Sequence, residues 1–355
     1  MIVLASQAPI FYTGNGYTKL SNYLSSSKPS LIFVLVDTNT HNNCLNTFLQ
    51  QLETDVTIEI IEMDAGEEHK NIETCSGIWE TLSELGADRK SLMINLGGGV
   101  ITDLGGFVAS TFKRGIAYIN VPTSLLAMVD ASVGGKCGVD LGNLKNQIGV
   151  INQSEMVLID PNYLITLPAN EMRSGLAEIL KHGLIASEEY WEKATNLEAL
   201  ALEDLDSLIM ESIEIKSRIV KEDPTEKNIR KTLNYGHTLG HAIESYFLTN
   251  PNKTTLLHGE AIAAGMIMAT YLSHKICGFS ENNLKKVTKK INGLFPKINL
   301  VEEDYEKVLD LLKFDKKNSH GNINFVLLKD FGEAELDVIV PNNQLKQAMD
   351  YYLKN

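Results

Sequence analysis

The sequence predicts an α/β protein with a parallel sheet in its N-terminal part and mainly α-helices in its C-terminal part. Short continuous apolar runs alternate with amphipathic segments up to about residue 160, as in βα units whose strands are buried on both faces. One of these runs leads directly into a glycine triplet, Gly97-Gly98-Gly99. Beyond Pro161 the apolar residues recur with helical periodicity. These observations place a domain boundary near 165, between domains 1–165 and 166–355.

The N-terminal elements follow from the apolar runs in chain order. Residues 1–11 are expected to form an edge strand, and Gly14-Asn15-Gly16 a turn into a short helix. Further strands are expected at 31–36, 56–61, 92–96, 116–121 and 156–160, with helices at 43–52 and 71–85. Right-handed crossovers would join them into a Rossmann-like parallel sheet, although the G-x-G-x-x-G pattern is missing. Ligands bind beyond the carboxyl ends of such strands, where Asp37, the segment 66–70 and the glycine triplet fall.

The C-terminal part is predicted to be mainly helical. Helical periodicity covers 169–186, 197–220, 226–247, 257–274 and 281–293. Two short apolar runs, 323–328 and 334–338, are expected to form a hairpin, and 344–353 a closing helix.

Composition excludes several classes of partner. The chain has 355 residues, 44% of them hydrophobic and 22% charged, which suits two globular domains. A net charge of −13 argues against nonspecific binding to nucleic acid or to anionic membranes. No basic leader and no long uncharged apolar stretch is seen, so a cytoplasmic protein is expected. The four cysteines lie far apart without CxxC spacing, which indicates reduced thiols.

The glycine triplet and the segment that follows the next strand indicate an anion site. A glycine turn lets the backbone approach a phosphate, and the start of the following helix favours negative charge, although a simple tight turn would look the same. The segment 122–149 is too glycine-rich for a helix and is expected to be a loop lying against a ligand. Lys136, Lys145 and Asn146 within it, with Arg114 beside it, suit a small oxygenated anion. Taken singly, each of these residues could be solvated surface charge.

A second group of polar residues indicates a metal site in the helical domain. Glu178 and Lys181 are three residues apart and share a helix face, where a surface ion pair is the alternative interpretation. His237 and His241 are four residues apart, a spacing that can place two imidazoles on one metal. His258 follows in an apolar context at the start of the next expected helix. A carboxylate and histidines from three helices would form a catalytic Zn²⁺ site with open positions, in a mainly α-helical metal-binding domain.

Six motifs in order along the chain resemble the 3-dehydroquinate synthase family of sugar-phosphate cyclases. They read GGGVITDLGGF, VPTSLLAMVDASVGGK, NLKNQIG, RSGLAEILKHGLI, LNYGHTLGHAIE and LLHGEAIAAGM. The resemblance extends from about Asp37 to Lys317. It implies conversion of 3-deoxy-D-arabino-heptulosonate 7-phosphate to 3-dehydroquinate and phosphate, a step of the shikimate pathway, with NAD and Zn²⁺, Co²⁺ or another divalent metal. It also implies a cytoplasmic homodimer whose partner is a small sugar phosphate, not nucleic acid or membrane.

The resemblance assigns roles to individual residues. The implied metal ligands are Glu178, His237 and His258. His241 is implied in catalysis or substrate contact, together with Asp130, Lys136, Lys145 and Asn146. The implied substrate contacts are Arg114, Lys181, Lys216, Arg230, Asn234, Lys316 and Lys317. The implied NAD contacts are Asp37, Glu67, Lys70, Gly98, Gly99, Val100, Asp103, Thr123, Ser124, Asp130, Lys136, Lys145 and Thr166. At 124 the family usually has threonine, and serine keeps the hydroxyl.

Three other functions are compatible with parts of this pattern. Another sugar-phosphate cyclase would share most motifs, but the cationic residues favour a substrate with a carboxylate. A metal-dependent oxidoreductase of the glycerol dehydrogenase type would share the glycine turn and a helical metal domain, and would accumulate NADH. A sensor that binds NAD and a sugar phosphate without turnover would release no phosphate.

Overall fold

The structure is a computed structural model that describes residues 7–142, 144–196, 202–312 and 323–355. The chain divides into two compact units, Met1–Pro168 and Ala169–Asn355. This division lies close to the boundary at 165 expected from the sequence. That the first unit binds NAD and the second binds metal and substrate stays a prediction.

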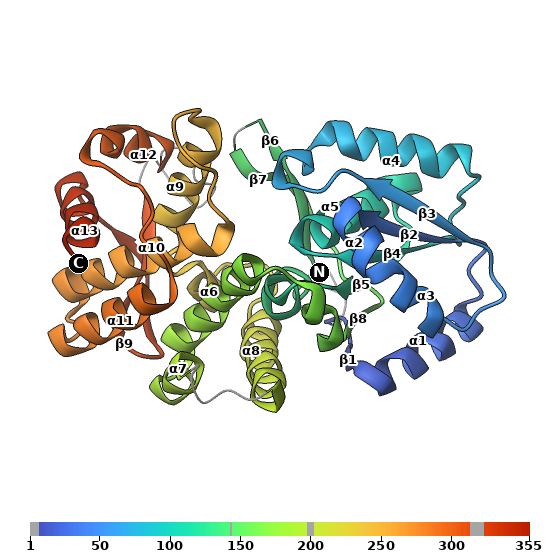
Figure 1. Cartoon of the computed structure of the whole chain (residues 1–355), viewed down its shortest axis with the longest axis horizontal. Helices are drawn as coiled ribbons and strands as arrows, with labels where there is room; N and C mark the ends of the chain where they lie inside the picture. The colour runs from blue at the N-terminus through green and yellow to red at the C-terminus, as the bar shows by residue number, and fades with distance from the viewer. Residues whose placement is uncertain (1–6, 143, 197–201, 313–322) are drawn as a thin grey trace. The chain divides into compact units, whose positions relative to one another are not determined.

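The N-terminal unit is built on a parallel sheet of six strands. The strands are β1 (Ile10–Tyr12), β2 (Ile32–Asp37), β3 (Ile58–Met63), β4 (Leu92–Gly97), β5 (Ala117–Pro122) and β8 (Met156–Ile159). Their order is β1-β8-β5-β4-β2-β3, so the short β1 lies at one edge (Figure 1). The chain runs from β2 to its neighbour β3 and then returns to the other side of β2 as β4. The carboxyl ends of β2 and β4 therefore flank a topological switch point, where open α/β sheets bind their ligands.

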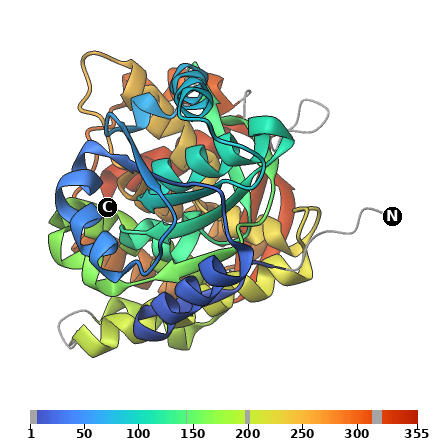
Figure 2. The same cartoon turned by 90° about the vertical axis from the view of Figure 1, so that its right-hand side faces the viewer.

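Helices cover both faces of this sheet. Helices α4 (Ile72–Glu84) and α5 (Gly99–Thr111) lie on one face, and α1 (Thr13–Ser27) and α3 (Asn46–Gln51) lie on the other (Figures 1 and 2). Phe33 and Leu35 belong to the core beneath α4 and α5. Because strand side chains alternate, the residues between them point toward α1 and α3. Both faces are buried, as the continuous apolar runs predicted.

Two predicted features at the start of this unit are wrong. Gly14 to Gly16 lie inside α1 rather than in a turn, and Gly16 is buried against Leu158 of β8. The helical segment after β2 begins at α2 (Thr38–Thr40) and continues through a π-helical turn, η1 (His41–Leu45), into α3. It begins at 38 rather than 43 because the carboxylate of Asp37 accepts a hydrogen bond from the backbone N–H of Thr40, at 2.8 Å.

The glycine-rich segment 122–149 is not the loop that was predicted. A π-helical turn, η4 (Ala127–Ala131), is followed by an antiparallel hairpin of β6 (Lys136–Leu141) and β7 (Leu144–Ile151). Gly138 and Gly149 pair across this hairpin, and a Cβ on Gly138 would lie 2.6 Å from the carbonyl oxygen of Ile148. These glycines therefore permit close approach of two backbones instead of marking an irregular loop.

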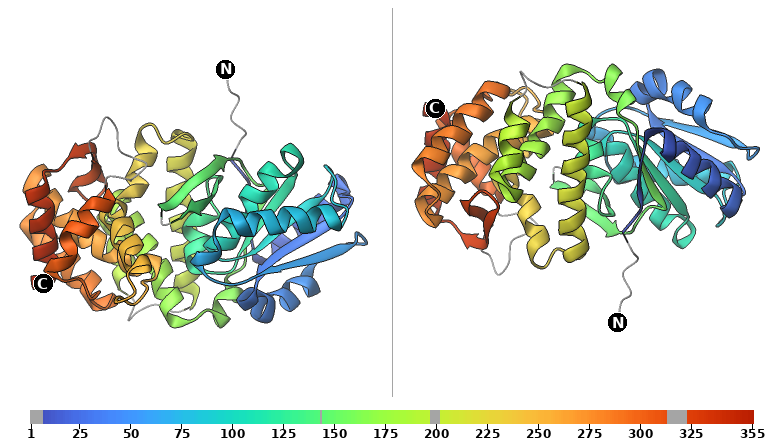
Figure 3. Two further views of the ribbon diagram at one scale, coloured as in Figure 1. Left: turned by 90° about the horizontal axis from the view of Figure 1, so that it is seen from above. Right: turned by 90° about the horizontal axis from the view of Figure 1, so that it is seen from below.

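The C-terminal unit is a helical assembly around α10, with one small hairpin. Its helices are α6 (Ala169–Ala186), α7 (Glu188–Thr195), α8 (Leu202–Glu222), α9 (His237–Thr249), α10 (His258–Leu272), α11 (Glu281–Leu294), α12 (Tyr305–Leu312) and α13 (Asn342–Lys354). Helix α10 is apolar nearly all round and packs against α6, α9, α11 and α13 (Figures 1 and 3). The hairpin joins β9 (Asn324–Asp330) and β10 (Glu333–Ile339).

The structure confirms α6, α11, α13 and the hairpin, and corrects the helix expected at 226–247. That segment is a short 3-10 helix, η7 (Ile229–Asn234), followed by α9. The break lies at Gly236, whose φ of +77° is a left-handed conformation that glycine adopts readily. Helices α7 and α12 were not predicted, and residues 197–201 of the expected third segment lie outside the described residues. In the described ranges no helix combines the length and apolarity needed to cross a membrane.

Candidate active site

Residues far apart in sequence meet at the carboxyl edge of the parallel sheet. Gly98 precedes α5, and the first N–H groups of that helix have no partner within the helix. The N–H of Thr123, just after β5, donates to the carbonyl of Gly97 at 3.0 Å. Gly98 also faces Ser124, since a Cβ there would lie 3.3 Å from the Ser124 hydroxyl. Gly99, Val100 and the ends of β4 and β5 thus lie close together at this edge, and that their backbone binds an anion stays a prediction.

The buried thiol of Cys44 marks where three more predicted cofactor residues converge. Its side chain hydrogen-bonds to those of Thr123 and Thr166, and the Asp37 carboxylate lies close enough to act on it electrostatically. Burial, followed by this carboxylate, raises the pKa of Cys44 to about 11. Asp37 ends β2, Thr123 follows β5, and Thr166 closes the 3-10 helix η5 (Pro161–Thr166). The parallel topology, which puts all strand ends at one edge, brings them together.

A network of charged side chains joins the hairpin to the loop after β3. The ammonium of Lys70 donates to Asp103 Oδ2 of α5 and to Asn146 Oδ1 of β7, both at 2.7 Å. The neighbouring Lys145 pairs with Glu67, whose carboxylate oxygen lies 2.6 Å from Nζ. Burial disfavours the charged form of Lys70, but nearby carboxylates, Asp103 first among them, outweigh burial and raise its pKa. Five of the predicted cofactor and catalytic residues therefore form one network.

Three remaining predicted residues of this unit have different placements. Asp130 lies in η4, and Lys136 is the first residue of β6. Arg114 is exposed in a 3-10 turn, η3 (Phe112–Arg114), after the far end of α5. Since the 13 residues of α5 span about 20 Å, Arg114 lies well away from Gly99, not beside the anion site. Its expected grouping with the cationic residues of the glycine-rich segment stays a prediction.

The Lys70 network yields a testable prediction. Lys70→Met should weaken NAD⁺ binding at least about tenfold, because Asp103 and Asn146 lose the cation that holds them together. It should also lower the free energy of unfolding by about 1 to 3 kcal/mol, since the half-buried carboxylate of Asp103 loses its buried partner. Titration calorimetry with NAD⁺ and denaturant unfolding measure the two effects. Lys90→Met, at an exposed position before β4, is the control. Wild-type NAD⁺ affinity in folded Lys70→Met would contradict the assignment.

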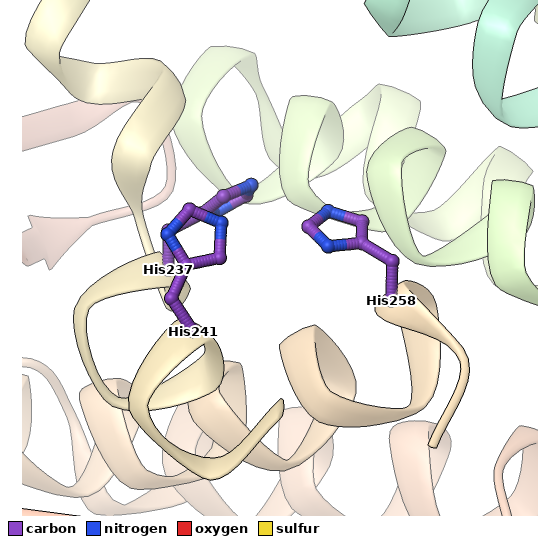
Figure 4. Close-up of side chains that lie close together, drawn as sticks. All are labelled: His237, His241 and His258. Atoms are coloured by element: carbon purple, nitrogen blue, oxygen red, sulfur yellow. The ribbon is translucent and has the colours of Figure 1, made fainter. Parts of the chain in front are cut away.

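In the C-terminal unit, three helices bring a carboxylate and two imidazoles to one point. Oε1 of Glu178, on α6, lies 3.3 Å from Nε2 of His237 on α9 and 3.3 Å from Nε2 of His258 on α10. The ring of His241 lies beside them, and nitrogens of all three histidines fall within 4.8 Å of one another (Figure 4). Such a donor set suits Zn²⁺ or a similar divalent ion. The assignment of His241 to proton transfer rather than to the metal stays a prediction.

Hydrogen bonds to the far ring nitrogens fit a metal at this point. Nδ1 of His237 lies 3.1 Å from the carbonyl oxygen of Tyr235, and Nδ1 of His258 lies 3.2 Å from Oε2 of Glu244. Each acceptor requires Nδ1 to carry the proton, which leaves the Nε2 lone pair directed at the shared point. This is the arrangement of metal-binding histidines, whose second nitrogen donates to a carbonyl or carboxylate.

Glu178 and Lys181 form a buried ion pair rather than a solvated one. Their side chains are 0% and 1% exposed. Burial raises the pKa of Glu178, but Lys181 and then His237 outweigh burial and hold that pKa well below its usual value. The ionised form of Glu178 is therefore favoured, although the side chain is buried. The alternative of a surface ion pair is wrong.

Close backbone packing places these side chains. Gly259, next to His258, lies so near α6 that a Cβ would be 2.2 Å from the carbonyl oxygen of Ser174. The Ser174 hydroxyl accepts the N–H of Gly259 at 2.9 Å. Ser174 is one helical turn before Glu178, so this contact sets the distance between Glu178 and His258. Gly259, the glycine of LLHGEA, thus lets α10 approach α6 closely enough to bring His258 to Glu178.

Three cationic residues predicted to bind substrate are buried in the same unit. Lys181, Lys216 of α8 and Arg230 of η7 are 1%, 6% and 1% exposed. Helices α8 and η7 both pack on α6, which carries Lys181. Asn234 ends η7, where its amide donates to Glu226 Oε1 at 2.8 Å. Lys181 pairs with Glu178, and Nη1 of Arg230 donates to the carbonyl oxygen of Pro224 at 2.8 Å, so that these cations bind a substrate anion stays a prediction. Lys316 and Lys317 lie outside the described residues.

Comparison with known proteins decides the family. The family description "3-dehydroquinate synthase N-terminal" matches residues 60–174, and "3-dehydroquinate synthase C-terminal" matches 175–318. The chain is 42% identical over 337 residues to a 3-dehydroquinate synthase of Parabacteroides distasonis, covering 94% of this chain and 95% of the relative. It is 43% identical over 283 residues to one of Clostridium perfringens, covering 78% and 79%. The chain belongs to the 3-dehydroquinate synthase family.

Solved structures agree with this family at the level of the fold. A 2-epi-5-epi-valiolone synthase from Streptomyces hygroscopicus, with NAD⁺ and Zn²⁺ bound, superposes with a TM-score of 0.86 at 24% identity, over 100% of this chain and 99% of that one. A probable glycerol dehydrogenase from Sinorhizobium meliloti reaches 0.66 at 11% identity, over 98% and 97%. The cyclase fold is therefore the nearer of these two folds.

Two carboxylates of this family member support the site but were not predicted as site residues. Oδ1 of Asp140 accepts the N–H of Asn146 at 2.6 Å, and Asn146 has a φ of +52°. Asp223 accepts the N–H groups of Lys227, Asn228 and Arg230, at 3.0, 2.7 and 3.1 Å. Asp140 holds the backbone of Asn146 within the β6–β7 hairpin, and Asp223 holds the segment that leads into Arg230. Both Asn146 and Arg230 carry predicted roles. Asp140 lies within the glycine-rich segment, but its position in the sequence did not indicate which residue it would contact. No sequence pattern pointed to Asp223.

Proposed function

We propose that this enzyme converts 3-deoxy-D-arabino-heptulosonate 7-phosphate to 3-dehydroquinate and phosphate, with NAD and Zn²⁺ as cofactors. The observation that carries the proposal is the group of Glu178, His237 and His258 in the same unit as three buried cations. A metal site alone would suit many alcohol oxidations. Cationic side chains in the same unit suit a substrate that also carries a carboxylate and a phosphate. Curated relatives that cover nearly the whole chain support this substrate.

The chemistry explains why a reaction without net oxidation needs a redox cofactor. NAD⁺ and a divalent metal would supply transient oxidation of a secondary alcohol of the substrate, with the metal polarising its oxygen. The ketone makes the neighbouring proton acidic enough for phosphate to be eliminated. Because the cofactor would be used only transiently, ring opening and intramolecular aldol closure would give the carbocycle with no net oxidation.

The chain's own residues would bind, orient and move protons. In the C-terminal unit, Glu178, His237 and His258 would hold the metal. Lys181, Lys216 and Arg230 would bind the anionic groups, with Asn234 beside them as a neutral donor. His241 would transfer a proton, since its ring centroid lies 5.1 Å from that of His237 and it need not be a ligand.

For the N-terminal unit we propose cofactor contacts and supporting catalytic roles. The backbone of Gly98 and Gly99 would receive the pyrophosphate at the start of α5. The hydroxyls of Thr123 and Ser124 and the carboxylate of Asp37 would hold other polar groups of NAD. Asp130, Lys136, Lys145 and Asn146 would act on the substrate, as the family resemblance implies.

The decisive experiment measures phosphate release and NADH absorbance together. We expect phosphate in many-fold excess over catalytic NAD⁺, no accumulation of NADH, and loss of turnover on chelation that is restored by Zn²⁺ or Co²⁺. Release only from a different phosphorylated sugar would identify another cyclase. Stoichiometric NADH from a simple alcohol would identify a dehydrogenase, and binding of NAD without turnover a sensor.

A cytoplasmic homodimer is proposed on family resemblance. Light scattering of the purified chain at micromolar concentration should give a mass near twice 39.3 kDa. A monomer at that concentration would contradict this part of the proposal.

A further inference from the structure

Glu244 is a buried carboxylate that no predicted role explains. It lies on α9, seven residues after His237, so the two side chains are on the same side of the helix. Its side chain is 7% exposed, and Oε2 lies 3.2 Å from Nδ1 of His258. Burying a carboxylate is costly, and an apolar residue at this position would serve helix packing better. Helix packing alone therefore does not explain a glutamate at this position.

We propose that Glu244 is a positioning residue for His258, an inference that rests on the metal site of the proposed function. The carboxylate accepts a hydrogen bond from the Nδ1–H of His258 and so fixes the tautomer of the ring. The Nε2 atom then points toward Oε1 of Glu178. Its negative charge also makes the imidazole a stronger ligand. Glu244 thus acts through His258 and need not touch substrate or cofactor.

The two imidazoles of the metal site differ in how they are held. His237 is 8% exposed, and its Nδ1 faces a backbone carbonyl, that of Tyr235. His258, like His237, is the first residue of its helix, but it is 28% exposed, so packing restricts its ring less. Its orientation depends correspondingly more on the hydrogen bond that its Nδ1–H donates to a side chain. This difference makes His258 the ligand that a single substitution can release.

The test measures metal binding rather than turnover. Full-length wild type, Glu244→Gln and Glu244→Ala are freed of metal, then titrated with Co²⁺ in competition with a chromophoric chelator. Glutamine can still accept the Nδ1 proton but lacks the charge, so we expect about tenfold weaker binding. Alanine removes both effects, and we expect about 100-fold weaker binding, within the range for partners of metal-bound histidines. The visible spectrum of bound Co²⁺ should also change in the alanine variant.

Asp304→Asn is the matched control. Asp304 is also buried, and its carboxylate accepts a hydrogen bond at 2.7 Å from Tyr246, which lies on α9 like Glu244. Among the described residues, Asp304 makes no contact with His258. This variant should lose thermal stability and keep wild-type Co²⁺ affinity. If both Glu244 variants bind Co²⁺ like wild type, the positioning role is overturned while the metal site stands. If wild type binds no Co²⁺, or His237→Ala binds it equally well, the metal site itself fails and the inference with it. Should Glu244→Ala not fold, the nearly isosteric glutamine variant decides.

Discussion

Replacing Glu178 with glutamine is expected to reduce phosphate release at least about 10³-fold and to abolish stoichiometric metal binding. The metal would lose its one anionic ligand, and the electrostatic stabilisation it contributes is several kcal/mol, of which about 4 kcal/mol corresponds to 10³ in rate. The same substitution leaves the ammonium of Lys181 buried beside a neutral amide. Breaking a buried ion pair in this way should lower the free energy of unfolding by about 3 kcal/mol. Metal analysis, turnover and denaturant unfolding test the three effects.

Glu281→Gln is the matched control for this prediction. Glu281 and Lys285 form an ion pair on α11 at 2.6 Å, with side chains 64% and 69% exposed. Removing its charge should change neither stability nor metal content measurably, because exposed pairs contribute little. A Glu178→Gln enzyme with full metal content and wild-type stability would mean that the carboxylate is no ligand.

Gly259→Ala is expected to lower the free energy of unfolding by about 3 kcal/mol and to weaken metal binding. The added Cβ would lie 2.2 Å from the carbonyl oxygen and 2.5 Å from the Cα of Ser174, and neither backbone atom can rotate away. Helices α6 and α10 must therefore separate, at the cost that overpacking usually brings. The separation would also move His258 from Glu178. Thermal unfolding and Co²⁺ titration measure the two consequences.

Gly293→Ala is the control, because it should leave the free energy of unfolding unchanged or raise it. Gly293 is exposed near the end of α11, and a Cβ there meets no atom within 4 Å. Alanine should leave stability unchanged or raise it by up to about 1 kcal/mol, through helix propensity and loss of unfolded-state freedom. Equal stability of the two glycine variants would show that the contact between α6 and α10 yields easily and does not position the site.

Local patterns were sufficient for most of the fold. The strand at 31–36 was found because a strand buried on both faces needs a continuous apolar run. The helix at 169–186 was found because its apolar residues recur with helical periodicity. Predictions failed at several glycines, because the sequence does not show whether a glycine forms a turn, breaks a helix or permits close packing. Gly138 and Gly149 allow two strands to meet, Gly236 breaks a helix, and Gly16 packs inside one.

For the candidate site, the sequence identified the polar residues but not most of the contacts that they make with one another. The spacing of His237 and His241 indicated imidazoles on one helix face, and the tertiary structure adds Glu178 at 3.3 Å from His237. Asp140 and Glu244 were missed because each acts on a residue that only folding brings near.

By itself, the sequence determined the order of the βα units, the glycine turn at the end of β4, the helical second half and the set of polar residues with chemistry to perform. These depend on local periodicity and on residue type, which are properties of short stretches of chain. Only the tertiary structure decided that Glu178 and Lys181 are buried, that a hairpin follows the helical turn η4, and that Glu244 faces His258. Burial and partners depend on contacts between distant segments, and the direct approach of Gly259 to Ser174 is the contact that brings Glu178 and His258 together.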